Sequence, residues 1–225
     1  MNDGKAQAWS WFSTGPALAW SDGEGTRHPA RRPPPEPSHR RNIMANWAVW
    51  VGSVRKGSYN AAIARALAEL APAGTSIDIL PSVAQFPIYD ADLQAEGFPA
   101  VVEDTGARIA KADGLIIVTP EYNYSVPGGL KNAIDWVSRL PGKPVAGKPV
   151  LIQSASQGVL GGARAQYHLR QILVFLDGRV FNVPEVMVGK VQTLVEDGSL
   201  TDAGTRDFIA GQLKAFSAFA ESFKK

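Results

Sequence analysis

Residues 52–60 read Gly52-Ser53-Val54-Arg55-Lys56-Gly57-Ser58-Tyr59-Asn60, between an apolar run, 47–51, and a second run, 61–68, whose apolar residues have helical spacing. The order is therefore strand, tight polar loop, helix. Such a loop directs backbone N–H groups and short hydroxyls to one spot beside the positive end of the helix dipole, which suits a phosphate dianion. The pattern favours phosphate binding. An ordinary strand-to-helix turn that carries Ser and Arg is the alternative.

Two side chains of this loop have the chemistry of phosphate ligands. Arg55 carries a guanidinium that can bind phosphate oxygens through two hydrogen bonds. Ser58 is placed as an N-cap or as a phosphate ligand. The loop lacks both the G-x-x-x-x-G-K-[ST] pattern of nucleoside triphosphatases and the G-x-G-x-x-G fingerprint of dinucleotide binders. The phosphate is therefore not expected to belong to ATP.

The charge of the chain is nearly balanced. Its net charge is +2, and the six Lys/Arg and four Asp/Glu of residues 1–43 account for that excess, so the remainder is formally neutral. Neutrality argues against nucleic-acid binding through a broad basic patch. The chain has no cysteine, which excludes disulfides, thiolate metal sites, iron–sulfur clusters and thiol nucleophiles. Any redox chemistry must therefore come from a bound cofactor.

Metal sites and membrane segments are not expected either. The three histidines, His28, His39 and His168, are scattered along the chain. No apolar run is long enough to span a bilayer. The arginine pairs at 31–32 and 40–41 suggest an export signal, but no hydrophobic signal segment or cleavage site follows them. We therefore expect a cytoplasmic protein.

Residues 1–43 differ in composition from the rest. The stretch 22–41 is rich in Gly, Pro, Arg and Glu and shows no periodicity, so it cannot easily bury enough surface to offset its ordering entropy. Met44 stands just before the first predicted strand. We predict that 1–43 is a disordered or non-native N-terminal extension and that 44–225 forms one domain. A natural, disordered tail with a binding role is the alternative.

From Met44 the chain alternates strand-like and helix-like segments, as in a parallel α/β sheet. The predicted strands are 47–51, 75–80, 115–118, 150–152 and 180–183. The predicted helices are 61–68, 100–112, 130–140, 163–176 and 201–223, the last capped by Thr201 or Asp202. Loop 81–99 is long enough to be a functional flap. The alternation predicts an α/β fold: a flavodoxin-like, doubly wound, five-stranded parallel sheet of order 2-1-3-4-5.

Ligands of such a sheet bind beyond the carboxyl ends of the strands, where loops 52–60, 119–129 and 154–162 leave the first, third and fourth strands. Loop 119–129 has prolines near both ends, two glycines, and two tyrosines that suit stacking on a flat heteroaromatic ring. Loop 154–162 is rich in small residues, which let a planar ligand lie against backbone N–H groups. The alternatives are a Pro-rich connector whose tyrosines only pack, and a flexible glycine loop.

One phosphate and one flat ring, bound without a metal or a nucleophile, describe a mononucleotide cofactor. FMN fits this description best. AMP or a nicotinamide nucleotide fits much of it as well, so the residues alone leave the choice open.

Two segments taken together resemble those of a known family. Residues 52–60 and 119–136, the latter reading TPEYNYSVPGGLKNAIDW, are similar to the NADPH-dependent FMN reductase family, and most similar to its bacterial chromate/quinone reductases. The likeness runs from about residue 47 to the C-terminus and includes none of residues 1–43.

The resemblance implies tightly but non-covalently bound FMN, NADPH or NADH as the electron donor, and a homodimer or homotetramer. The residues expected to hold the FMN phosphate and ribityl chain are Ser53, Arg55, Ser58, Tyr59 and Asn60. Those expected to border the isoalloxazine ring are Pro120, Glu121, Tyr122, Asn123 and Tyr124, with Ser156 closing the far side. The implied reaction is ping-pong hydride transfer from NAD(P)H through FMN to quinones and other acceptors such as chromate, and no side chain is nominated as a catalytic group.

Two other classes of function remain open. One is a flavodoxin-type electron carrier without NAD(P)H activity, and the other is a non-catalytic nucleotide-binding module. A neutral domain, and a phosphate loop unlike the Ser/Thr-rich loop of flavodoxins, argue against the carrier. Arg164 also has two interpretations: it attracts anions at the cleft mouth, or it joins Tyr124, Tyr167 and Glu185 in a network across a subunit interface. We favour the interface.

The remaining conspicuous residues are interpreted as structural. His168 is expected to pack or to lie at an interface, and Trp136 is expected to pack. Lys131 and Asp135 should form an i, i+4 ion pair. Solvated charges are expected at Arg139, Lys148 and Arg170. The last helix should bury an apolar stripe made of Phe208, Leu213, Phe216, Phe219 and Phe223.

Overall fold

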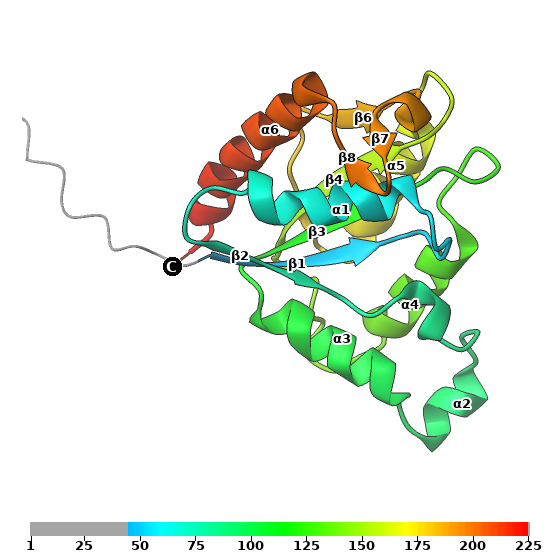
Figure 1. Ribbon diagram of the computed structural model, residues 1–225. Coiled ribbons are helices and arrows are strands. Elements are labelled where there is room, and N and C mark those ends of the chain that lie inside the picture. The colour runs from blue at the N-terminus through cyan, green and yellow to red at the C-terminus, as the bar shows by residue number, and fades with distance from the viewer. Residues whose placement is uncertain (1–44, 225) are drawn as a thin grey trace, which may run out of the picture. The chain divides into compact units, whose positions relative to one another are not determined.

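The computed structural model describes residues 45–224, which form a parallel sheet covered by helices on both faces (Figure 1). Met44 and the predicted extension 1–43 lie outside the described residues. The strands of the main path are β1 (Ala45–Val51), β2 (Thr75–Ile79), β3 (Gly114–Thr119), β4 (Pro149–Ala155) and β5 (Arg179–Val180). They are parallel and follow the order β2-β1-β3-β4-β5, so the predicted fold and topology are confirmed.

The five predicted helices are present, with ends shifted by a few residues. They are α1 (Tyr59–Leu70), α3 (Ala100–Lys111), α4 (Gly128–Ser138), α5 (Ala163–Phe175) and α6 (Ala203–Glu221). The last helix begins where the Asp202 carboxylate accepts a 2.7 Å hydrogen bond from the Thr205 amide, and the interactions with the side chain and the amide of Thr205 lower the pKa of Asp202. Asp202, one of the two predicted caps, is therefore the N-cap.

Alternate residues of the central strands enter two separate cores. Trp47 and Val49 of β1 pack with apolar residues of α1 and α6, whereas Ala48 and Trp50 pack with those of α3, α4 and α5. Figure 1 shows α1 and α6 on one side of the sheet and α3 and α4 on the other. Strands β3 and β4 are buried along their whole length, so most of their residues are apolar, and their few buried polar side chains form hydrogen bonds within the protein.

The predicted fifth strand is wrong beyond Val180. Strand β5 has two residues, the chain then leaves the sheet, and it returns as β6 (Val186–Val188), which pairs with the carboxyl half of β4. Pro184 lies in the interruption and has no N–H to give to a ladder. A short 3-10 turn, η2 (Val191–Thr193), and a hairpin of β7 (Val195–Glu196) with β8 (Ser199–Leu200) follow before α6.

Loop 81–99 is folded against α4, which does not agree with a free flap. It contains a 3-10 turn, η1 (Val83–Gln85), and a short helix, α2 (Ala91–Glu96). The Asn132 side chain accepts a hydrogen bond from the Tyr89 amide (2.8 Å) and donates one to the Pro87 carbonyl (2.8 Å). Trp136, which is fully buried as predicted, donates its indole N–H to the same carbonyl at 2.9 Å. One face of α4 therefore anchors the loop.

The apolar stripe of α6 is only partly in the core. Leu213 and Phe216 are fully buried, but Phe208 and Phe223 are 48% and 43% exposed. Ile209 occupies the buried position that the prediction assigned to Phe208, because the helix meets the sheet about 100° further around its axis.

Each of the three arginine and lysine residues predicted to be solvated contacts another group of the protein. Arg170 forms an ion pair with Glu185 at 3.0 Å, and the guanidinium of Arg139 lies 5.2 Å from the centre of the Tyr89 ring. Lys148 donates to the Ala112 carbonyl, and burial lowers its pKa. The predicted pair of Lys131 with Asp135 is confirmed at 2.7 Å. Within residues 45–224, none of the helices has the length and apolar character needed to cross a bilayer.

The anchoring of loop 81–99 gives a stability prediction. Replacing Asn132 by Ala leaves the Tyr89 amide and the Pro87 carbonyl with one partner fewer, and should lower the free energy of unfolding by about 1–3 kcal/mol. Asp135→Ala, which removes only a surface pair on the same helix, should cost less than about 0.5 kcal/mol. Urea unfolding and amide hydrogen exchange at Tyr89 measure both effects. Unchanged exchange at Tyr89 would contradict the anchoring role.

Candidate functional site

A cleft lies where β1, β3 and β4 end at the same edge of the sheet. Its cavity volume is about 160 Å³, and its walls come from the loops that follow these three strands. The lining residues are Ser53, Arg55, Ser58, Tyr59, Asn60, Pro120, Glu121, Tyr122, Ala155, Ser156 and Gln157. Crossover connections leave β1 toward β2 and β3 toward β4 on opposite sides, so the cleft stands at the switch in strand order, where doubly wound sheets bind ligands.

Nearly all of the predicted cofactor residues meet in this cleft. Asn123 and Tyr124 are the exceptions, because they form the tip of a turn beyond the cavity wall. Ala155 and Gln157 line the cleft and were not predicted, although they flank Ser156 within a loop already identified from the sequence. Whether each lining residue contacts a ligand remains a prediction.

The first loop presents donors without partners. The backbone N–H groups of Ser53, Val54, Lys56 and Gly57 donate no hydrogen bond to any atom of residues 45–224. Ser58 is the N-cap of α1: its Oγ accepts from the Ala61 amide at 3.2 Å, which leaves its own hydroxyl proton free to donate. These groups stand beside the N-terminus of α1, so their charge and geometry suit a phosphate.

Arg55 and Gly52 shape the same loop. The guanidinium of Arg55 lies 4.8 Å from the centre of the Tyr59 ring, which holds an otherwise exposed cation near the loop. At Gly52, a Cβ would lie 2.5 Å from Thr119 Oγ1. Glycine is therefore required there for the ends of β1 and β3 to lie together.

Asn60 ties the first loop to the third. Its amide nitrogen donates to the Ala155 carbonyl at 3.0 Å, and its amide oxygen accepts from the Ala155 N–H at 3.0 Å. The side chain thus has a structural role, and what Asn60 can offer a phosphate is its backbone N–H at the start of α1.

Glu121, in the second loop, supplies a cap for α5. The N-cap position of this helix is Gly162, which has no side chain to offer. The carboxylate of Glu121 accepts from the backbone amides of Arg164 (3.0 Å) and Ala165 (3.3 Å), and it also pairs with the Arg164 guanidinium. The hydrogen bond between the Arg164 guanidinium and the Glu121 carboxylate raises the pKa of Arg164 above its ordinary value. The loop and the helix therefore hold each other in place.

The glycines of the third loop have packing reasons. A Cβ at Gly161 would lie 2.5 Å from the Met187 carbonyl carbon, and one at Gly162 would lie 2.9 Å from Ser154 Cβ. Both residues also have positive φ, of 57° and 89°. Close packing against β6 and β4 therefore requires glycine at these two positions, and the predicted approach of a planar ligand to this loop stays a prediction.

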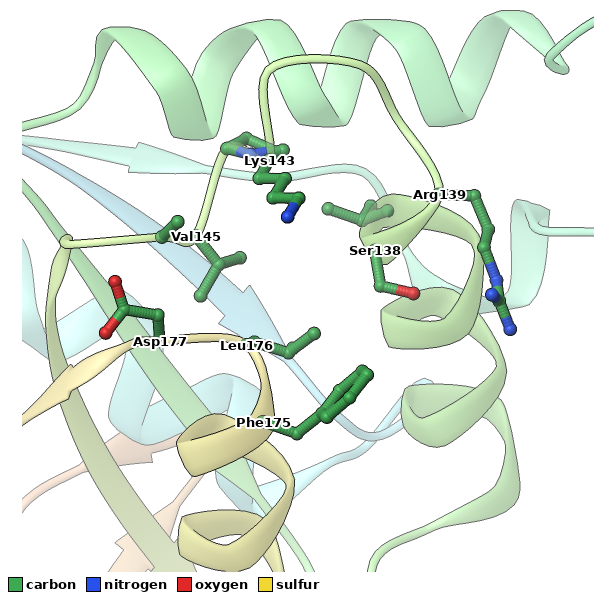
Figure 2. Close-up of a pocket in the computed structure, with 10 residues that line it drawn as sticks. Ser138, Arg139, Lys143, Val145, Phe175, Leu176 and Asp177 are labelled. Carbon is green, nitrogen blue, oxygen red and sulfur yellow. The ribbon is translucent and has the colours of Figure 1, made fainter.

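A larger hollow lies elsewhere on the surface and has a different character. It has a volume of about 370 Å³ and lies between the ends of α4 and α5; Figure 2 shows Ser138 and Lys143 around it, with Phe175 and Leu176 on another wall. Its residues belong to the segments that enter β4 and β5, so it lies at the amino edge of the sheet. Ligands of doubly wound folds bind at the opposite edge, and the hollow is therefore not the candidate cofactor site.

The residues predicted at an interface form contacts within one chain. Arg164 lies over the Tyr124 ring, with 3.8 Å from its guanidinium carbon to the ring centre. Tyr167 donates to Glu185 at 3.2 Å, and Arg170 binds the other oxygen of that carboxylate. Among residues 45–224, no three His, Asp or Glu side chains lie together as a metal site requires.

The sheet order defines a flavodoxin-like α/β protein, and the donors that line its cleft suit a phosphate. Comparison with known proteins then gives the family. Residues 45–193 match the NADPH-dependent FMN reductase family, and the chain belongs to it. It is 60% identical over 177 residues to a quinone reductase of Escherichia coli strain K12, an alignment that covers 77% of this chain and 94% of that one.

Two further relatives agree with this assignment. An NAD(P)H-dependent FMN reductase of Pseudomonas aeruginosa is 47% identical over 174 residues, with 77% and 94% of the two chains covered. Among solved structures, the flavoenzyme NAD(P)H:(acceptor) oxidoreductase FerB from Paracoccus denitrificans has a TM-score of 0.72 and 35% identity, and covers 80% of this chain and 98% of that one. Family membership makes the chain an oxidoreductase that uses FMN as cofactor and NAD(P)H as electron donor.

The cleft fits FMN on its own chemistry. The free amides of the first loop, the Ser58 hydroxyl and the Arg55 guanidinium offer the set of donors that a phosphate monoester requires. Pro120 and Tyr122 stand across the cleft, with Ser156 on the third wall. The expected assignment of the first loop to the phosphate and of the second to the ring is compatible with this arrangement.

A phosphate-specific prediction follows for Arg55. Losing one charge-assisted hydrogen bond, worth about 1.5–3 kcal/mol, should weaken FMN binding by about 10- to 100-fold in Arg55→Ala. Affinity for riboflavin, which has no phosphate, should be unchanged. Lys111→Ala, an exposed cation at the far end of α3, serves as the control. Equal losses for FMN and riboflavin, measured by quenching of flavin fluorescence, would refute phosphate binding by Arg55.

Proposed function

We propose that this protein is an FMN-dependent NAD(P)H:quinone oxidoreductase. The observation that carries the proposal is the three-walled cleft at the switch in strand order, which is lined by the first loop with its free amides and by the aromatic side chain of Tyr122. The relatives named quinone reductase support a quinone as the electron acceptor. Bound FMN would supply the redox chemistry, which is hydride transfer from NAD(P)H and transfer of the electrons to an acceptor.

The protein contributes position and charge to this reaction. Donors of the first loop hold the anionic end of the cofactor, and the prolines and the turn of the second loop keep the ring end in place. Tyr122 is about half exposed, so an aromatic surface remains beside the cleft on which a flat quinone or nicotinamide can lie. We assign no side chain as nucleophile, acid or base.

The proposal also concerns which electron acceptors are preferred, among them the oxyanion chromate. One of the two interpretations of Arg164 was that it attracts anions at the cleft mouth, but its guanidinium is paired with Glu121 and lies over the Tyr124 ring. An oxyanion would therefore meet a largely neutralised surface at that position. We propose that quinones are the preferred acceptors and that chromate is reduced more slowly.

Anaerobic reduction tests this function. The FMN-loaded protein should lose its flavin absorption when NADPH or NADH is added, and a quinone should restore it; chromate should restore it more slowly. FMN and NADPH mixed without protein are the control. A yellow protein that neither nucleotide bleaches would favour the electron carrier. A colourless protein that takes up no FMN would reject both functions and leave a nucleotide-binding module.

We propose further that the protein is a cytoplasmic homodimer or homotetramer, with Arg164, Tyr167 and Glu185 at or near the interface. Support comes from the outward face of α5 and the segment after it, where apolar side chains are unusually exposed. Phe175 is 90% exposed, and Val174 and Val183 each exceed three quarters. Exposed apolar groups gathered on one face are typical of surfaces that associate.

Mass in solution tests the assembly. Tyr167→Glu places a second carboxylate beside Glu185 on this face, and should lower the mass measured by sedimentation to that of a smaller oligomer. Ile88→Glu, at an exposed apolar residue of the loop before α2, should leave the mass unchanged. Arg164→Ala separates the two roles of that arginine: a smaller assembly supports the interface, whereas an unchanged mass with a higher KM for anionic acceptors supports the cleft.

A further inference from the structure

The turn at residues 122–125 is closed and strained. Tyr122 and Ser125 pair in both directions, with N···O distances of 3.0 Å each. The two residues between them, Asn123 and Tyr124, have φ values of 47° and 72°, in the left-handed region. A two-residue turn of this kind is normally built from Asn followed by Gly, and tyrosine in the second position bears the steric cost that glycine avoids. Contacts from outside the turn must therefore hold it in this conformation.

Those contacts come from the first two turns of α5. At one turn of the helix, Glu121 caps the N-terminus and Arg164 lies over the Tyr124 ring. At the next turn, His168 Nδ1 lies 2.9 Å from Ser125 Oγ. Residues 164 and 168 are neighbours on one helix face, so α5 contacts the turn at both its tip and its exit.

Ser125 occupies the exit of the turn, three residues before α4 begins at Gly128. Pro127, the N-cap of α4, offers no side-chain cap, and the Lys131 amide binds its carbonyl at 3.0 Å. A tether at Ser125 therefore limits both the turn and the entry into the next helix. Without it, the contacts of Glu121 and Arg164 remain, but the exit of the turn loses its side-chain contact with α5, and Tyr122 is held less firmly in the cleft that it lines.

We propose that His168 is a positioning residue: through Ser125 it fixes the turn that places Tyr122 in the cleft, and it thereby controls how firmly the ring end of FMN is held. This inference rests on the proposed function, in which FMN occupies the cleft. A packing role for His168 would require only the volume of the imidazole, whereas the positioning role requires a hydrogen-bonding atom at the place of Nδ1. The Ser125 hydroxyl can donate to Nδ1 or accept from it, so the contact does not depend on one protonation state of the ring.

The test uses this difference between volume and hydrogen bonding. In His168→Asn an amide atom can reach the place of Nδ1, whereas in His168→Gln the amide lies one bond further out. Gln171→Asn, at an exposed position of the same helix, is the matched control. The FMN-loaded proteins are diluted, and the released flavin is followed by its fluorescence. The visible spectrum of the bound flavin and thermal unfolding of each variant are recorded in parallel.

We expect His168→Gln and Ser125→Ala to bind FMN about tenfold more weakly, with shifted flavin bands. The FMN affinity of His168→Asn and of Gln171→Asn should stay within about twofold of the affinity of the wild-type protein. The double variant of Ser125→Ala and His168→Gln should be no weaker than either single variant, because both remove the same hydrogen bond.

Three results would overturn the inference. The first is unchanged FMN release from His168→Gln. The second is an equal loss of FMN in the Asn and Gln variants that follows their loss of thermal stability, since that result identifies a packing residue. The third is a wild-type protein that binds no FMN, in which case the proposed function fails and this inference fails with it. In the first two results the wild-type protein still binds FMN, so failure of the inference can be distinguished from failure of the proposed function.

Discussion

The structure depends on the burial of β3 and β4 on both faces of the sheet. Backbone groups in such strands have no access to water, so each N–H and C=O must pair with a neighbouring strand. Parallel pairing in turn brings the carboxyl ends of β1, β3 and β4 to one edge, where Val51 lies beside Val118 and Thr119 beside Ser154. Three loops with little sequence in common are thereby forced to meet. The position of the cleft is therefore determined by the pairing of the strands, and the loop residues determine only how it is lined.

The parts that the sequence predicts well are those controlled by local pattern. Short apolar runs alternate with helical periodicity, and this is sufficient for the order 2-1-3-4-5 and for most of the residues that line the cleft. The errors arise where distant residues decide. Segment 81–99 looks like a flap until Asn132, more than forty positions away, binds its backbone. Strand β5 stops after Val180 although residues 181–183 are compatible with a strand, because the chain leaves β4 and returns six residues later as β6. Propensity within a window contains no information about either event.

Glu121 shows how a functional position can also be a structural one. In the sequence it stands between Pro120 and Tyr122, and this position predicts a place beside the flavin ring. The structure turns its carboxylate toward the N-terminus of α5, where Gly162 leaves the first amides without a side-chain cap. A cap supplied from another part of the chain has no sequence signature of the S/T-x-x-E kind, so it could not be recognised beforehand. The same geometry makes the second loop and α5 one unit, since displacing either leaves the other with unpaired polar groups.

Each wall of the cleft is held by contacts that do not involve a ligand. The Asn60 side chain joins the first loop to Ala155. The Ser154 hydroxyl donates to the Gly161 carbonyl and accepts from the Gln166 side chain, so the third loop is held by β4 and α5. A site whose walls are already in place loses little conformational freedom when a cofactor enters, which favours tight non-covalent binding. The donors left over in the first loop are mainly backbone amides, which every residue except proline possesses. The capacity of the loop to bind a phosphate would therefore depend largely on where its backbone is held, with the side chains of Arg55 and Ser58 as additional donors. For that reason the residue types alone could not distinguish FMN from another mononucleotide.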